Sequence, residues 1–190
     1  MAQEILDGLG TGRTARVTER NQLDTFAVCQ NRVADISEYN GNAFIIASDF
    51  ISLTTTASFS GVLYFKNTST TSQLFIKTIR VCADGAMGDM QVKIIKNAST
   101  GTLISDENPA YVNSANLIKN TVFQGVAYKG ADAKTMTDGT FFTQFTNHTP
   151  GHSIQDYEGL IVMGTGTSLG IEVKPSNAMN LCIEVQCWYE

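Results

Sequence analysis

Two stretches near the C-terminal end of the sequence alternate strictly between apolar and other residues. In Ser168–Lys174, the side chains of Leu169, Ile171 and Val173 fall at every second position, and Leu181–Tyr189 repeats the pattern. A period of two residues is typical of a β-strand, in which successive side chains point to opposite faces. Both stretches are therefore predicted to be strands with one buried face.

Most of the chain from residue 43 onward has the features of short strands. Further candidates, rich in β-branched and aromatic residues, are Ala43–Ala47, Phe50–Thr55, Gly61–Asn67, Gln73–Ala83, Met90–Lys96, Val122–Lys129, Thr140–Thr146 and Leu160–Met163. With no long helical pattern, this spacing predicts an all-β fold, an antiparallel β-sandwich. The long connections favour a jelly roll over a seven-stranded immunoglobulin-like domain, and an up-and-down barrel is the third option.

Residues 1–42 differ from the sandwich domain predicted for residues 43–190. They hold four arginines and few large apolar side chains, so they can bury little by themselves. A hairpin is predicted from Thr14–Thr18 to Gln22–Val28. We interpret residues 1–42 as an extended N-terminal arm that orders on a neighbouring subunit, and the alternative is an edge hairpin folded onto the same domain.

Charge is scarce in this chain of 190 residues. Only 16% of them are charged, the net charge is −5, and the basic residues are scattered singly. The sequence therefore predicts no nucleic-acid footprint. A surface of small neutral polar groups costs little to desolvate, which suits a chain covered by partners. The alternative is that many β-rich proteins carry abundant Thr and Ser.

The four cysteines, Cys29, Cys82, Cys182 and Cys187, have no CxxC spacing. Cys182 and Cys187 lie on opposite faces of one predicted strand, so they are not expected to bond to each other. We predict four free thiols in a chain made in a reducing cytoplasm. Neither a signal peptide nor a membrane-spanning run is expected.

Candidates for catalysis are few, and we expect no enzyme activity and no catalytic, cofactor or metal site. His148 and His152 fall in a predicted loop, Thr146–Ser153, with Asp156 and Glu158 following. Such a cluster can bind a metal, but it is more often a solvated loop. The sequence has no Gly-x-Ser-x-Gly, HExxH or EF-hand motif.

Trp188, the only tryptophan, is predicted to point away from the buried face of its strand. It is either the cap of a second small cluster or an interface anchor. The candidate interface residues are Arg13, Arg16, Val17, Leu23 and Phe26 in the arm, together with Trp188.

Several motifs resemble a family of small structural proteins of tailed bacteriophages. They are Gly10-Thr11-Gly12 with Ala15-Arg16-Val17, Asn21-Gln22-Leu23, Gly41–Ile46, Leu63–Asn67, Leu74–Ile79, Gly101–Ser105 and an Asn-rich stretch near Asn113–Asn120. The resemblance covers most of the chain, and its motifs are structural. It implies a virion protein with a jelly-roll-like domain, often a trimeric capsid decoration (cement) protein and in some cases a tail protein. It assigns no individual functional residue.

The leading hypothesis is a capsid decoration protein at the virion surface, whose partners are the major capsid protein and further copies of itself, as a homotrimer. A second hypothesis is a tail or fibre-tip protein that binds a host glycan through the loops Gly130–Gly139 and Thr146–Tyr157, with Tyr128 and Tyr157 as stacking platforms. The third, an enzyme on a β-sandwich, lacks a metal motif.

Overall fold

The computed structural model describes residues 5–6, 14–17, 23–24, 41–99, 109–115 and 121–190. The chain divides into two compact units, residues 1–31 and 32–190. The first contains a small antiparallel sheet in the order β1-β2-β3, made of β1 (Ile5–Leu6), β2 (Thr14–Val17) and β3 (Leu23–Asp24). Val17 pairs with Leu23 and Arg16 with Asp24, as the predicted hairpin requires, and the rest of its second strand lies outside the described residues. Whether residues 1–42 act as an arm stays a prediction.

The described part of the second unit consists of strands and the connections between them. The strands are β4 (Ala43–Ala47), β5 (Ile51–Leu53), β6 (Ser60–Asn67), β7 (Leu74–Lys96), β8 (Tyr111–Ser114), β9 (Gly125–Lys129), β10 (Thr140–Met163), β11 (Ser168–Pro175) and β12 (Met179–Tyr189). All strand pairs are antiparallel. The predicted all-β class is confirmed.

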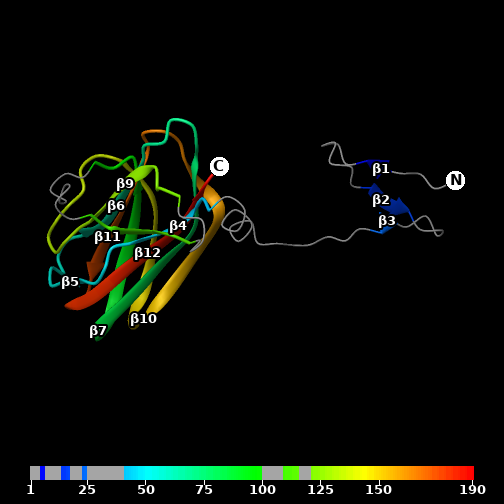
Figure 1. The fold of residues 1–190 in the computed structure, drawn as a ribbon. Coiled ribbons are helices and arrows are strands. Elements are labelled where there is room, and N and C mark those ends of the chain that lie inside the picture. Colours follow the sequence, from blue (N-terminus) through cyan, green and yellow to red (C-terminus); the bar gives the residue numbers. More distant parts are fainter. Residues whose placement is uncertain (1–4, 7–13, 18–22, 25–40, 100–108, 116–120) are drawn as a thin grey trace. The chain divides into compact units, whose positions relative to one another are not determined.

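Two sheets pack face to face as a β-sandwich (Figure 1). The first sheet has the order β8-β4-β12-β7-β10 and uses the N-terminal half of β7 and the C-terminal half of β10. The second sheet has the order β9-β6-β11-β7-β10 and uses the other halves of β7 and β10. This is the pairing order of a jelly roll, with two Greek keys.

Strands β7 and β10 are longer than the sequence predicted. The sequence predicts Gln73–Ala83 and Met90–Lys96 as two separate strands, with Asp84–Gly88 between them, and Thr146–Ser153 as a loop. In the structure both stretches lie inside continuous strands, which bend and pass from one sheet to the other. At Gly85 a Cβ atom would lie 2.9 Å from the Met179 Cα atom, so the bend requires glycine there. Glycine therefore permits a bend here instead of reversing the chain.

The core lies between the two sheets and follows the predicted alternation. On β12 the side chains of Leu181, Ile183 and Val185 are fully buried, and β11 contributes Ile171 and Val173 to the same core. Burial of a side chain of this size stabilises the fold by about 1.5–3 kcal/mol. The period-two pattern thus identified the face of each strand that meets the other sheet.

A loop from Gly130 to Gly139 covers the outer face of the second sheet. Met136 packs there against Tyr64, and its N–H donates a hydrogen bond to the buried carboxylate of Glu172 over 3.2 Å. Lys93 forms an ion pair with the same carboxylate. Asp132 fixes the start of the loop, because its carboxylate accepts a hydrogen bond from the Thr55 N–H over 3.0 Å.

Candidate interaction surface

Strand β10 is the outer edge of both sheets on one side of the sandwich. Among the residues that the structure describes, β7 is the only strand that pairs with β10. The backbone N–H and C=O groups on the other side of β10 therefore have no strand partner there. An unpaired edge of 24 residues is a template on which another chain can add a strand.

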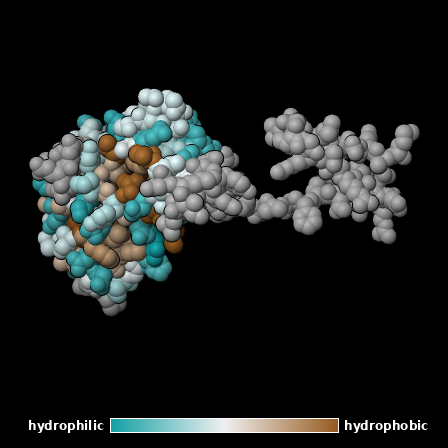
Figure 2. Space-filling model, viewed as in Figure 1, coloured by the Kyte–Doolittle hydropathy of each residue, from teal (hydrophilic) through white to brown (hydrophobic). Residues whose placement is uncertain are grey.

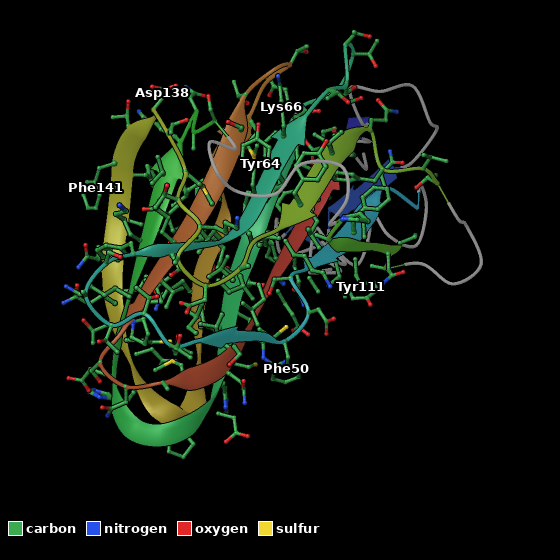
Figure 3. All side chains as sticks on the ribbon, turned by 90° about the vertical axis from the view of Figure 1, so that its left-hand side faces the viewer. Phe50, Tyr64, Lys66, Tyr111, Asp138 and Phe141 are labelled. Atoms are coloured by element: carbon green, nitrogen blue, oxygen red, sulfur yellow. The ribbon has the colours of Figure 1, made fainter. Side chains whose placement is uncertain are left out.

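Five large apolar side chains of β10 are exposed to solvent, and we call them the β10 surface. They are Phe141, Phe142, Ile154, Leu160 and Val162, with exposed fractions from 44% for Phe142 to 86% for Leu160. Figure 3 shows Phe141 at the border of the sandwich, pointing away from the neighbouring strands. Single exposed apolar residues are ordinary, but several along one unpaired strand make this border a candidate interaction surface.

The two ends of β10 meet at this surface. Phe142 near its start, and Leu160 and Val162 near its end, line one hollow of about 230 Å³ together with Asn97 and Leu169. They come together because β10 runs along one sheet, bends, and returns along the other. The sequence placed these residues in two separate strands, so it did not show that they share a site.

The N-terminal half of β10 lacks the usual protections of an edge strand. Thr140–Asn147 contains no charged residue and no proline. Natural edges commonly carry lysine or proline to stop further pairing. Titratable groups begin only at His148, whose Nδ1 lies 2.6 Å from the Asp89 carboxylate.

An insertion in the C-terminal half of β10 shapes the β10 surface. Asp156 pairs with Thr78 and Ile161 with Ile76, so residues 157–160 bulge out of the ladder. The Glu158 N–H donates to the Asp156 carboxylate over 3.0 Å. Gly159 has a φ of 84°, and a Cβ atom there would lie 2.8 Å from the Trp188 ring. The bulge thus covers Trp188 and leaves Leu160 in solvent.

Trp188 caps a small second cluster, one of the two alternatives left open by the sequence. It packs against Ala43, and its ring stacks on Phe75 at 5.4 Å between centroids. Its Nε1–H donates to Glu190 over 2.9 Å. With an exposed fraction of 3%, the side chain offers little surface to a partner, so its place as an exposed interface anchor is corrected.

The predicted contacts of the arm remain predictions. Arg13 and Phe26 lie outside the described residues. Arg16 and Val17 belong to β2 and Leu23 to β3, and Arg16 pairs with Asp24 in the backbone ladder.

The predicted histidine loop is wrong, because its residues belong to β10. His148 pairs with Asp89 and His152 with Cys82 across the ladder to β7. The sequence pattern Thr-Pro-Gly suggested a loop, but Pro150 and Gly151 occupy the bend of the strand, where the register shifts. In the described ranges, no three His, Cys, Asp or Glu side chains gather closely enough to hold a metal ion.

The two tyrosines proposed as glycan platforms do not project from loops. Tyr128 lies on β9 and stacks on Tyr64 at 6.0 Å between ring centroids. Tyr157 belongs to the bulge of β10, packs against the core, and has its pKa raised by burial. The geometry that the glycan hypothesis expected at these two positions is therefore not present.

A second hollow, of about 470 Å³, lies on the opposite side of the sandwich. Its walls include Phe44 of β4, Val112 of β8, Phe123, and Ala127 of β9. Figure 2 presents one face of the molecule, on which hydrophobic side chains gather among hydrophilic ones.

Among the residues that the structure describes, no helix is long and apolar enough to cross a membrane.

Compared with models of known protein families and with curated protein sequences, the chain matches none of them. What the chain does is therefore inferred from its own residues.

Proposed function

We propose that this chain is a structural protein of a bacteriophage particle, a decoration (cement) protein that binds the assembled capsid shell and stabilises it. In this proposal its partners are the major capsid protein and other copies of itself, in a homotrimer on the capsid surface. The observation that supports it best is the β10 surface. A long unpaired edge strand with five exposed apolar side chains, and with no charged residue in Thr140–Asn147, suits a chain that works while covered by protein.

In this proposal the arm and the sandwich domain have separate roles. The β10 surface joins the sandwiches of neighbouring copies, and residues 1–42 contact the shell. A protein that binds the assembled shell and not its loose subunits stabilises the shell by mass action. Several such contacts engaged by one trimer give avidity without any strong single contact. No catalytic or metal-binding residue takes part in this function.

Fold and composition add support that is independent of the bacteriophage resemblance. The two sheets of the described sandwich are joined directly, because both of them include parts of the long strands β7 and β10. Its few charges keep the cost of desolvation low when large surfaces are covered. The bacteriophage part of the proposal depends on the sequence motifs given above.

Deletion of residues 1–28 tests the proposed role of the arm. We expect the shortened chain to keep its β-sheet circular dichroism and its oligomeric state, and to lose binding to assembled shells in a co-sedimentation assay. Undiminished binding by a folded, shortened chain would count against the proposal.

The number of copies in an intact particle separates decoration from a role at the tail. Quantitative mass spectrometry against the major capsid protein should give a copy number that scales with the area of the shell. A few copies per particle, together with binding of the purified chain to a glycan array, would favour the tail hypothesis instead.

A further inference from the structure

Cys82 and Cys182 lie directly opposite each other on neighbouring strands of the first sheet. Cys82 is on β7 and Cys182 on β12, and the two are partners in the antiparallel register. Both are free cysteines with partly exposed side chains. They point to the outer face of the sheet, because their neighbours Val81 and Ile183 point into the core. Two thiols are therefore adjacent to each other and accessible to small molecules.

The hydrogen-bond pattern fixes the geometry of this pair. The Ile183 C=O accepts from the Ser48 N–H, and the Ile183 N–H donates to the Ser48 Oγ, both over 2.9 Å. Since Ile183 turns its amide groups away from β7, the adjacent Cys182 turns its own toward β7 and Cys82. In such a hydrogen-bonded pair the Cα atoms are about 5.5 Å apart, and disulfides span about 4.4–6.8 Å between Cα atoms.

The Cβ atoms make the bond possible but strained. Opposite residues on antiparallel strands have Cβ atoms about 4.5–5.5 Å apart, with hydrogen-bonded pairs at the longer end. A relaxed disulfide needs about 3.5–4.5 Å. A small local twist of β7 against β12 supplies the difference. A disulfide formed under such strain is more easily reduced than an ordinary structural one.

The surroundings of the pair set how fast it reacts. Partial burial and the nearby Glu184 carboxylate raise the pKa of the Cys182 thiol. His152 of β10 is the other ladder partner of Cys82. Cys187 differs from both, because it is fully buried in the core and burial raises its pKa far above the ordinary value. Cys187 therefore serves as an internal control for an inert thiol.

We propose that Cys82 and Cys182 are an oxidation site that closes as a cross-strand disulfide by exchange with a low-molecular-weight disulfide such as oxidised glutathione. One cysteine thiolate attacks a glutathione sulfur, which breaks the S–S bond and releases one glutathione thiolate. The second cysteine thiolate attacks the protein-bound sulfur of the mixed disulfide and releases the other. The protein thiols are oxidised, one oxidised glutathione becomes two reduced molecules, and the two thiol protons go to them.

This site does not depend on the proposed function, but it fits a chain that leaves a reducing cytoplasm for an oxidising medium. While the chain is synthesised the pair stays reduced and the strands can reach their register. After release, the bond links β7 to β12 in the middle of the first sheet. The bond locks a sheet that is already folded.

The test uses the full chain with Cys29→Ser, since Cys29 lies outside the described residues. The folded protein is incubated with excess oxidised glutathione at mildly alkaline pH, alkylated, and analysed by intact mass and peptide mapping. We expect the loss of two hydrogen atoms in mass, the loss of both reactive thiols, and one cross-linked peptide pair that contains Cys82 and Cys182. Cys187 should be alkylated only after denaturation.

Single substitutions separate a disulfide from simple thiol reactivity. Cys82→Ser and Cys182→Ser should each keep one stable glutathione adduct in place of the cross-link, while Cys187→Ser should oxidise as the parent does. Stable glutathione on both cysteines of the parent, or two unmodified thiols after prolonged incubation, would overturn the proposal. Circular dichroism of each variant confirms that the comparison is made between folded proteins.

Discussion

Strands β8 and β9 border the sandwich on one side, and β10 borders it on the other. The first border is made of strands of four and five residues, and the second is one strand of 24. On the β8 and β9 side, the Lys129 Nζ atom forms an ion pair with the Asp49 carboxylate at 3.4 Å and lies 5.6 Å from the centre of the Tyr111 ring. The N-terminal half of β10 has no such charge. The comparison teaches that the two borders differ in kind: one consists of short strands with a lysine ion pair, and the other is one long strand whose first eight residues carry no charge.

On the β10 side of the sandwich, we expect substitution in the bulge at residues 157–160 to lower the stability of the fold most. Gly159→Ala places a Cβ atom against the Trp188 ring and forces a positive φ, so we expect a loss of about 3 kcal/mol in the free energy of unfolding. Gly166→Ala is the matched control, since φ is 77° there but no atom lies within 4 Å of the added Cβ. It should cost only about 1 kcal/mol. Equal losses in urea unfolding would contradict the contact with Trp188.

A charge on the β10 surface should break the proposed self-association. We expect Phe141→Glu to weaken it by about 2 kcal/mol, roughly 30-fold, as loss of a buried aromatic anchor does. Tyr111→Glu is matched in exposure, 55% against 59%, but lies on the β8 and β9 side. It should leave the sedimentation profile unchanged. If both variants dissociate equally, the two sides do not differ as we propose.

The loop from Gly130 to Gly139 covers the second sheet next to β9, and its Asp132 makes a pH-dependent contribution to the stability of the fold. Burial raises the pKa of Asp132, but hydrogen bonds from Thr54 and Thr55 outweigh it and hold the pKa below its usual value. Its stabilisation is therefore complete above the unfolded value of about 3.9 and is lost as the pH falls through the lower folded value.

Asp132→Asn should then destabilise the fold by about 1 kcal/mol or less at neutral pH, because the carboxylate is partly exposed. Urea unfolding at pH 7, 5 and 3 should show the difference between the two proteins shrink only at the lowest pH. A difference that is constant across this range would exclude the carboxylate as its source.

Removal of Lys129, on the β8 and β9 side, should have the smallest effect on stability and association. Lys129→Thr should change the free energy of unfolding by about 0.5 kcal/mol or less, as expected for a partly exposed ion pair near the surface. It should add only weak association at high protein concentration, measured by light scattering. Association as strong as that through β10 would show that the lysine, and not the length of the strand, separates the two borders.

The strands that the sequence predicted well are those that pair with one neighbour on each side within a single sheet. Ala43–Ala47 matches β4 at both ends, and the alternation in β11 and β12 identified their buried faces. The sequence prediction failed at Gly85 and Pro150, because the same residues that reverse a chain also allow a strand to bend. Only long-range pairing, with β11 and β12 on either half of β7, decides between the two.

The candidate surface was the least predictable part. The adjacent Phe141 and Phe142 gave a usable signal, because two consecutive side chains of a strand cannot both face the core. That Leu160 joins them depends on the path of β10 between the sheets. One of the two alternatives for Trp188, the cap of a second small cluster, was correct. The bulge that covers its ring is formed by residues 157–160, and no local sequence pattern marks these residues as a bulge.

The shared strand β7 also determines when this protein can fold. Every strand that pairs with β7 follows residue 139 in the chain, and so do the partners that bring β4 and β6 into their sheets, β12 and β11. A ribosome adds about 5–20 residues per second, so the apolar residues of β7 leave it seconds before their partners exist. The core therefore cannot assemble until β10, β11 and β12 have been synthesised, and a chain that stops before residue 140 lacks all three of these partners of β7.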